Sequence, residues 1–133
     1  SSFRDKIDRI HKEGNQRISL PASDGLLFLQ KNEIVLIEYI SFEKGIKPYW
    51  SVIVYDNRRI TLRRNVKGRD ILGILNSHDF FMINSGTILN LNYLSFVDYK
   101  SRDCIMVPPY DKTRHTISRN RLVKFKERYD SML

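Results

Sequence analysis

Residues 80–90 of the chain read FFMINSGTILN. Two apolar runs, 80–83 and 87–91, flank the polar triplet Asn84-Ser85-Gly86. Short runs rich in Ile, Phe and Leu that are separated by an Asn/Ser/Gly turn are typical of paired β-strands. We therefore predict two strands joined by a turn at residues 84–86.

Similar apolar runs lie on both sides of this pair and predict further strands. They are rich in Ile, Val and Tyr and are separated by turn residues, among them Asp56-Asn57. Pro108-Pro109 excludes a central strand at that point because proline has no amide hydrogen to donate. The predicted strands are 17–20 and 26–29 around a turn at 21–25, then 34–42, 49–55, 58–62, 94–99, 104–107 and 113–117.

Helices are predicted where apolar residues recur at helical spacing. Apolar residues at this spacing predict a helix over residues 65–75. The spacing of Leu122 and Phe125 predicts a final helix that begins after Ser118. Residues 3–13 show the same pattern, either as a linker from an upstream domain or as a packing helix of this domain. The predicted fold class is therefore mainly β and antiparallel, with two or three short helices.

The positive charge of the chain is concentrated in two stretches. The chain has 133 residues and a formal net charge of +8 at pH 7. Residues 57–69, the first basic stretch, hold six Lys or Arg and no acid, and residues 111–128, the second, hold seven against two acids. The rest of the chain is therefore net negative. A focused basic surface on a small domain indicates a polyanion partner, most often a nucleic acid, and two solvated basic faces are the alternative.

Other features narrow the class of protein. The length suits one domain with a real core, and no apolar run is long enough to span a membrane. The single cysteine, Cys104, excludes an internal disulfide and a cysteine-based zinc site, and it fits a reducing, cytoplasmic location. The three histidines are scattered and are expected at the surface or in turns, and no phosphate-binding loop or nucleophile elbow is present. We expect no metal, no cofactor, no small-molecule substrate and no enzymatic activity.

The start of the final helix has a distinctive chemistry. Ser118 stands where an N-cap belongs, and Arg119 and Arg121 lie at the positive end of the helix dipole, which costs about 0.3–1 kcal/mol each at an exposed site. A phosphate bound at the free N–H groups would reverse that penalty. Arg119 has the guanidinium fork that reads a guanine edge, and Asn120 has the amide that reads an adenine edge. The alternative is a poorly optimised surface helix.

In their order along the chain, these segments resemble the LytTR domain, the DNA-binding output module of LytR/AlgR-type bacterial response regulators. The resemblance covers about residues 17–129. The central family motif reads roughly Phe-x-Arg-Ile-His-Arg-Ser-Tyr-x-Val-Asn, and a second motif is an apolar residue followed by Ser-Arg at the start of the last helix. The chain keeps the apolar skeleton and closing Asn of the first motif and the whole of the second, at Phe80, Ile83, Ile88, Leu89, Asn90, Ile117, Ser118 and Arg119.

The resemblance implies an elongated β-rich fold that reads DNA with loops and the start of the last helix. It also implies pairs of domains on tandem DNA repeats and an upstream receiver domain, so that residues 1–14 form a linker helix and residues 15–133 the DNA-binding domain. The chain departs from the family at residues 84–86, where Asn-Ser-Gly replaces His-Arg-Ser and removes a cation. This departure leaves open a LytTR-like module that has lost base reading and binds a protein partner instead.

We therefore predict sequence-specific binding of double-stranded DNA by the output domain of a cytoplasmic bacterial two-component transcription regulator. The expected partner is promoter DNA with tandem repeats, with a homodimer on DNA as a candidate assembly. Membrane binding is not expected, because no basic segment forms an amphipathic helix of the needed length. The predicted DNA contacts are Lys44, Lys47, Tyr49, Asn84, Ser85, Arg114, Arg119, Asn120, Arg121 and Lys124, with Arg63, Arg64 and His115 as candidate phosphate contacts.

Overall fold

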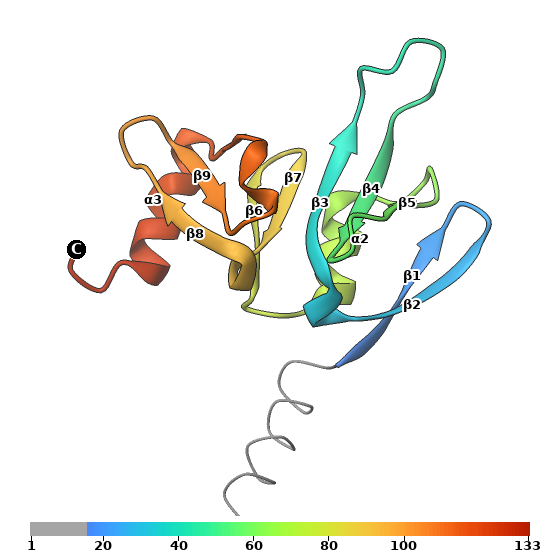
Figure 1. The fold of residues 1–133 in the computed structure, drawn as a ribbon, viewed down its shortest axis with the longest axis horizontal. Coiled ribbons are helices and arrows are strands. Elements are labelled where there is room, and N and C mark those ends of the chain that lie inside the picture. Colours follow the sequence, from blue (N-terminus) through green and yellow to red (C-terminus); the bar gives the residue numbers. More distant parts are fainter. Residues whose placement is uncertain (1–15) are drawn as a thin grey trace, which may run out of the picture. The chain divides into compact units, whose positions relative to one another are not determined.

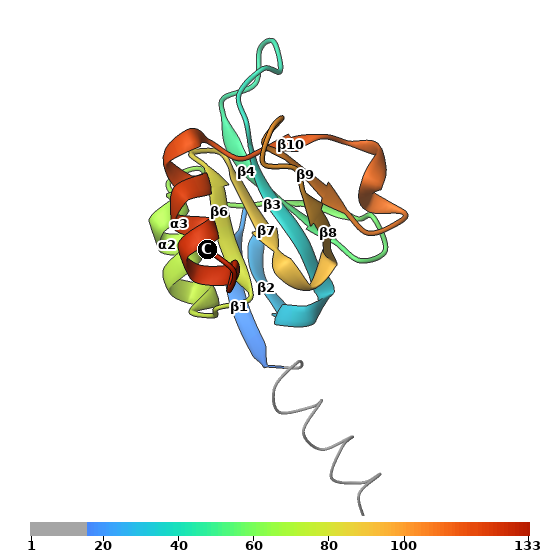
Figure 2. The same ribbon diagram turned by 90° about the vertical axis from the view of Figure 1, so that its left-hand side faces the viewer.

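A computed structural model describes residues 16–133 (Figure 1, Figure 2). The helix predicted at residues 3–13 lies outside the described residues. The chain divides into two compact units with the boundary between Ser77 and His78. Its described part is mainly antiparallel β with two α-helices, which confirms the predicted fold class. Within residues 16–133, neither helix has the length and apolar character needed to cross a membrane.

The first unit contains a hairpin, a three-stranded meander and one α-helix. Its elements are β1 (Arg17–Ala22), β2 (Gly25–Gln30), the 3-10 turn η1 (Lys31–Glu33), β3 (Ile34–Ile40), β4 (Tyr49–Val54), β5 (Arg59–Thr61) and α2 (Gly68–Leu75). Antiparallel pairing joins β1 to β2 and places β4 between β3 and β5. A short hairpin turn joins β4 to β5, as the Asp56-Asn57 signal predicts.

The core of the first unit forms around β3 and β4. Four consecutive residues of β3, from Ile34 to Ile37, are buried, so this part of the strand is covered on both faces. The helix α2 packs against β1 and contributes Ile71 and Leu75, which lie one helical turn apart and are fully buried. Burial on both faces explains why residues 34–37 form an uninterrupted apolar run instead of alternating with polar residues.

The second unit contains a hairpin, a three-stranded sheet and the C-terminal helix. Its elements are β6 (Phe80–Asn84), β7 (Thr87–Asn90), the 3-10 turn η2 (Leu91–Tyr93), β8 (Leu94–Val97), β9 (Asp103–Met106), the 3-10 turn η3 (Tyr110–Lys112), β10 (His115–Thr116) and α3 (Arg119–Tyr129). β6 pairs with β7, and β9 lies between β8 and β10. The predicted strand pair around residues 84–86 is therefore confirmed as an antiparallel hairpin.

Aromatic contacts hold α3 against β6, and Figure 2 shows the two elements side by side. Phe125 is buried and meets Phe81 edge to face, with 5.5 Å between the ring centroids. Tyr129, one turn later, meets Phe81 at 6.1 Å and donates its hydroxyl hydrogen to the His78 carbonyl at 3.2 Å. Such aromatic pairs contribute about 0.5–1.5 kcal/mol beyond the area they bury. Contacts of Phe125 and Tyr129 therefore hold α3 against β6 in the part of the helix that follows its exposed N-terminal turn.

The predicted start of the first helix at residue 65 is wrong, because α2 begins at Gly68. Val66 donates its N–H to the Arg63 carbonyl at 3.1 Å, which closes a turn before the helix. The Asp70 carboxylate accepts from the Lys67 N–H at 2.9 Å and so caps the first turn of α2. The prediction placed the helix start three residues too early, because the apolar Val66 belongs to the preceding turn and Asp70 caps the helix at Lys67.

The predicted turn at residues 21–25 is also too wide, because Pro21 and Gly25 belong to the strands. Pro21 lies opposite Leu26 near the end of a two-stranded sheet, where a residue without an amide hydrogen is tolerated. Its carbonyl accepts from the Arg63 N–H at 2.8 Å. Three other predicted strands are shorter in the structure, namely 34–42, 94–99 and 113–117. The strand β8 ends at Val97 because the carboxylate of the next residue, Asp98, accepts hydrogen bonds from two N–H groups of the following turn.

Cys104 is 1% exposed in β9, as expected for a small apolar side chain. Burial raises the pKa of its thiol to about 11, and the Asp103 carboxylate adds to the shift. The thiolate is the reactive form, and its population near neutral pH is about 100-fold lower than for a thiol with the ordinary value of 9.0. We expect slow alkylation by iodoacetamide in the folded chain and fast alkylation in urea, followed by mass spectrometry. Similar rates in both conditions would show that Cys104 is not buried in solution.

Candidate nucleic-acid interface

No side chain of the N-cap residue caps the backbone N–H groups at the N-terminus of α3. Ser118 is the N-cap residue, as predicted, but its hydroxyl caps no N–H group, and the first turn carries no acidic side chain. The Ser118 N–H donates to the Ile83 carbonyl of β6 at 2.8 Å. The N–H groups of a first helical turn have no partner inside the helix and carry the positive end of its dipole. This end of α3 is therefore suited to an anion.

Three exposed polar side chains surround this helix start. Arg119 and Asn120 occupy the first two helical positions, and Lys124 follows about one turn later. Arg121 differs because it is half-buried and its Nη1 donates to the Met82 carbonyl at 3.2 Å. Arg121 therefore ties α3 to β6, and the other three side chains remain at the surface.

The residues at the start of β10 differ from each other. Arg114 is 87% exposed, and its Nη1 lies 3.7 Å from Asp103 Oδ2, a long contact that contributes little and leaves the guanidinium at the surface. His115 is buried and lies opposite Cys104 in the β9–β10 ladder. The expectation that His115 lies at the surface is wrong, because alternation along β10 turns its side chain inward. His115 is therefore removed from the candidate phosphate contacts.

The chain that leads into α3 is held by side-chain hydrogen bonds. The Asn84 Nδ2 donates to the Thr116 carbonyl at 2.8 Å. The Arg102 Nη1 donates to the Ile117 carbonyl at 3.1 Å, and the Arg102 carbonyl accepts from the Ile117 N–H at 2.9 Å. We refer to residues 116–118 with these contacts from Asn84 and Arg102 as the clamp. The clamp fixes the backbone that enters the helix.

The clamp also joins the β6–β7 turn to the start of α3. Asn84 accepts from the Gly86 N–H through Oδ1 at 2.9 Å, so both ends of its amide are engaged in the structure. Ser85 is the exposed residue of this turn. The structure therefore brings the predicted contacts Ser85, Arg119 and Asn120 together in the second unit, and it places Asn84 as the residue that positions them.

Arg102 is a residue of this site that sequence reasoning missed. Its backbone has a φ of 65°, in the left-handed region that few residues other than glycine adopt, and its N–H donates to the Asp98 carbonyl at 2.7 Å. The turn predicted at residues 101–103 gives its approximate position. No sequence signal links an arginine there to a carbonyl fifteen residues later.

In the first unit, the predicted contacts lie at the loop between β3 and β4. Lys44 and Lys47 are exposed in this loop, residues 41–48, and Tyr49 is the half-buried first residue of β4. The Tyr49 hydroxyl donates to Glu43 Oε1 at 3.3 Å. Desolvation and the negative charge of Glu43 raise the pKa of Tyr49, so its hydroxyl stays protonated at neutral pH.

The first basic stretch is partly neutralised in the structure. Arg58 pairs with the aspartate two residues before it at 2.7 Å, and Arg59 pairs with Glu38 at 2.8 Å. Arg63 donates from Nη2 to a carbonyl of β2 at 3.3 Å but remains exposed, as does Arg64. Two of its six cations are thus matched by acids that lie outside the stretch, so its field is weaker than its sequence indicates.

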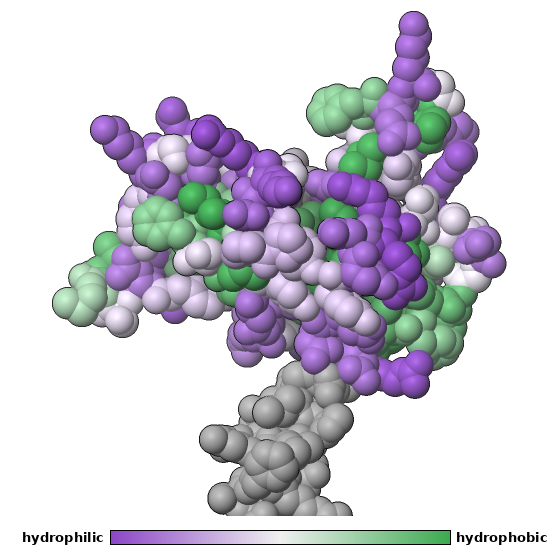
Figure 3. Space-filling view, viewed as in Figure 1, coloured by the Kyte–Doolittle hydropathy of each residue, from purple (hydrophilic) through white to green (hydrophobic). Residues whose placement is uncertain are grey.

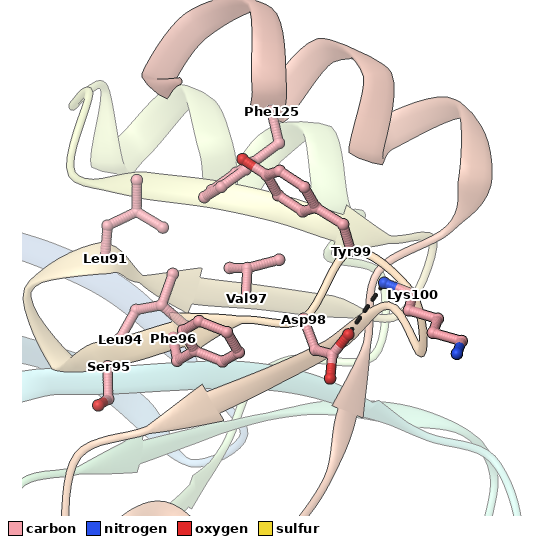
Figure 4. A pocket seen from close by; sticks show the side chains of 9 residues that line it. All are labelled: Leu91, Leu94, Ser95, Phe96, Val97, Asp98, Tyr99, Lys100 and Phe125. Carbon is pink, nitrogen blue, oxygen red and sulfur yellow. Dashed lines mark hydrogen bonds between the residues drawn. The ribbon is translucent and has the colours of Figure 1, made fainter. Parts of the chain in front are cut away.

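An open apolar groove lies elsewhere in the second unit, between β8 and α3 (Figure 4). It has a volume of about 650 Å³, and Figure 4 shows Leu91, Leu94 and Val97 facing it from one side and Phe125 and Tyr99 from the other. Its walls are mainly apolar, and no cluster of cations lines it. The groove is therefore separate from the anion-binding chemistry of the α3 start.

Tyr99, which lines this groove, also makes polar contacts. The Tyr99 hydroxyl donates to Asp130 Oδ2 at 2.6 Å, a hydrogen bond that raises the pKa of Tyr99 and lowers that of Asp130. The Lys126 ammonium lies 4.3 Å from the centroid of the Tyr99 ring.

Among residues 16–133, no three His, Cys, Asp or Glu side chains gather in a way that could hold a metal ion.

Comparison with known proteins identifies the fold. No family model and no curated protein matches the sequence. A solved structure described as the LytTr DNA-binding domain of a methyl-accepting/DNA response regulator from Bacillus cereus matches with a TM-score of 0.58. The match covers 86% of this chain and 96% of that chain at 15% sequence identity. The chain has the fold of a LytTR DNA-binding domain.

The residues by which the sequence resembles the LytTR motifs mostly build the core of the second unit. Asn90 accepts from the Asn92 N–H at 3.0 Å and so caps η2, and Ile117 is the buried centre of the clamp. Residues 84–86, where the sequence differs from the LytTR motif that it resembles, end β6 and form the β6–β7 turn, and Ser85 there is exposed, so this fold does not require a cation at that turn. The other buried motif residues are Phe80, Ile83, Ile88 and Leu89.

We expect Asn84→Ala to lower the free energy of unfolding by about 1–2 kcal/mol, because the Thr116 carbonyl and the Gly86 N–H lose their partner. The matched control is Ser85→Ala at the neighbouring exposed position, with an expected change within about 0.5 kcal/mol. Urea unfolding of both variants measures the difference. An equally small effect of the two substitutions would show that Asn84 contributes nothing to the clamp in solution.

Proposed function

We propose that the chain binds double-stranded DNA sequence-specifically, as the output domain of a bacterial two-component transcription regulator. The observation that carries the proposal is the clamped start of α3. There the exposed Arg119 and Asn120 sit at a helix end with no acidic residue and no side-chain cap, and the clamp joins this end to the turn at Ser85. The likeness in fold to a domain described as DNA-binding supports the same conclusion.

Phosphate groups are the first ligands of this site. One phosphate binds at the N–H groups of the first turn of α3, where the dipole and the Arg119 guanidinium both favour an anion. Lys124 on the same helix and Arg114 before it are exposed cations that bind neighbouring phosphates. These contacts set the register of the protein on the duplex and act alike on every sequence.

Base edges are read by exposed side chains next to the backbone that the clamp holds. Arg119 donates to the N7 and O6 atoms of guanine, and Asn120 donates to and accepts from the edge of adenine. Ser85 reaches a third base from the hairpin turn. Because the clamp fixes the backbone before binding, little backbone conformational entropy is lost when these side chains meet DNA.

The first unit and the assembly complete the proposal. Lys44 and Lys47 contact DNA from the β3–β4 loop and Tyr49 from the start of β4, and Arg63 and Arg64 bind phosphates. Two copies of the domain bind tandem repeats in a promoter, in the cytoplasm. Residues 1–14 link the domain to an upstream receiver.

Salt dependence tests whether phosphates are bound. For about six phosphate contacts, the slope of log affinity against log salt is expected to be about −5 on duplex DNA. Fluorescence anisotropy of a labelled duplex between low and physiological salt measures this slope. A slope near zero, or no duplex binding at low salt, contradicts the proposal.

Two substitutions on one helix separate base reading from phosphate binding. Arg119→Ala should cost about 1–3 kcal/mol and relax base preference at one position, and Lys124→Ala should weaken binding to all sequences alike. Arg128→Ala removes an exposed cation near the other end of α3 and serves as the control, with little expected change. Affinities for a set of single-base duplex variants measure both effects. A uniform loss from both substitutions would show that Arg119 is not a reader.

A protein-interaction module that has lost base reading is the second candidate function. It is favoured by the Asn-Ser-Gly turn and by the apolar groove, where Phe96 is 59% exposed. Selection of bound sequences from a random duplex pool separates the two functions. Enrichment of a common sequence supports DNA reading, and a pool that stays random supports the interaction module.

A further inference from the structure

The loop between β3 and β4 carries the most exposed aromatic side chain of the described residues. Phe42 is 93% exposed, and Ile46 in the same loop is 50% exposed. Figures show the loop extending beyond the ends of its strands (Figure 1) and hydrophobic and hydrophilic residues together at its end (Figure 3). Single exposed apolar side chains are common, and it is apolar side chains gathered on one exposed surface that mark a binding site.

The loop has a defined backbone and a mixed chemistry. The Ile46 N–H donates to the Glu43 carbonyl at 3.2 Å, which closes a four-residue turn. Gly45, the third residue of this turn, has a φ of 83°, and Lys44, the second, does not have a positive φ. This combination describes a type II turn, whose third residue requires such a φ. Glu43 is engaged by the Tyr49 hydroxyl at 3.3 Å, which leaves Lys44 and Lys47 as the exposed cations beside the two apolar residues.

Two cations beside an exposed aromatic side chain match a polyanion that also presents an apolar group. The major groove of DNA has such a group, because the 5-methyl of thymine is the apolar feature among the base edges and phosphates line both sides. We infer that Phe42 contacts a thymine 5-methyl group in the major groove and is a specificity-determining residue of this chain. The inference rests on the proposed function and adds a residue and a base to it.

An anionic membrane surface is the less favoured occupant of this loop. Stable binding to a membrane interface requires a large continuous apolar face, such as that of an amphipathic helix. This loop has eight residues, and only Phe42 and Ile46 are apolar and strongly exposed.

Replacement of thymine by deoxyuridine tests the inference, since it removes the 5-methyl group and nothing else. The probe is a duplex selected by the wild-type chain from a random pool, with each thymine replaced in turn. For wild type, one replacement should weaken binding about fourfold, which corresponds to the loss of one buried methyl group. Phe42→Ala should bind the thymine duplex at least fourfold more weakly and be insensitive to that replacement, and Phe42→Leu should keep part of the sensitivity.

The control is Phe96→Ala, which removes another exposed phenylalanine from β8 and should leave binding and thymine sensitivity unchanged. If wild type binds the duplex but no replacement changes its affinity, or if Phe42→Ala stays as sensitive as wild type, the inference is overturned and DNA binding stands. If wild type binds no duplex at low salt, the proposed function itself fails. If Phe42→Ala abolishes flotation with phosphatidylglycerol vesicles and leaves DNA binding intact, the loop binds membranes and the inference is also overturned.

Discussion

The second unit depends on how residues 116–118 are held. β10 has only two residues, so its ladder hydrogen bonds alone would hold the chain weakly before α3. The fully buried Ile117 side chain and hydrogen bonds from Asn84 and Arg102 supply the missing constraint. Removing one partner of such a contact leaves a backbone group unsatisfied, so these side chains matter more than ordinary surface residues. The direction in which α3 starts is a consequence of this arrangement.

The cations of the two basic stretches differ in their surroundings. In the first basic stretch, Arg58 and Arg59 are paired with acids, and Arg63 also donates to a backbone carbonyl. In the second, Arg119 and Lys124 are exposed beside a helix end that favours anions. The number of cations in a stretch of sequence therefore does not set its field, because acids brought close by the fold neutralise some of them.

Much of the fold could be predicted from the sequence because it depends on local patterns. The hairpin at β6–β7, the apolar run of β3 and the N-cap at Ser118 each follow from residues close together in the chain. The role of Arg102, the hydrogen bond from Asn84 to the Thr116 carbonyl and the burial of His115 could not be predicted, because each depends on contacts between distant segments. The DNA contacts assigned to individual side chains remain predictions.

The β6–β7 turn separates two tasks between neighbouring positions. Asn84 holds the backbone, and Ser85 beside it is exposed and takes no part in the clamp. Side chains of different size and charge can therefore replace Ser85 with little effect on folding. The same holds for Asn120 on the exposed face of α3. A combinatorial library at these two positions would keep one scaffold while varying what it binds, which makes the domain a starting point for redirecting recognition by design.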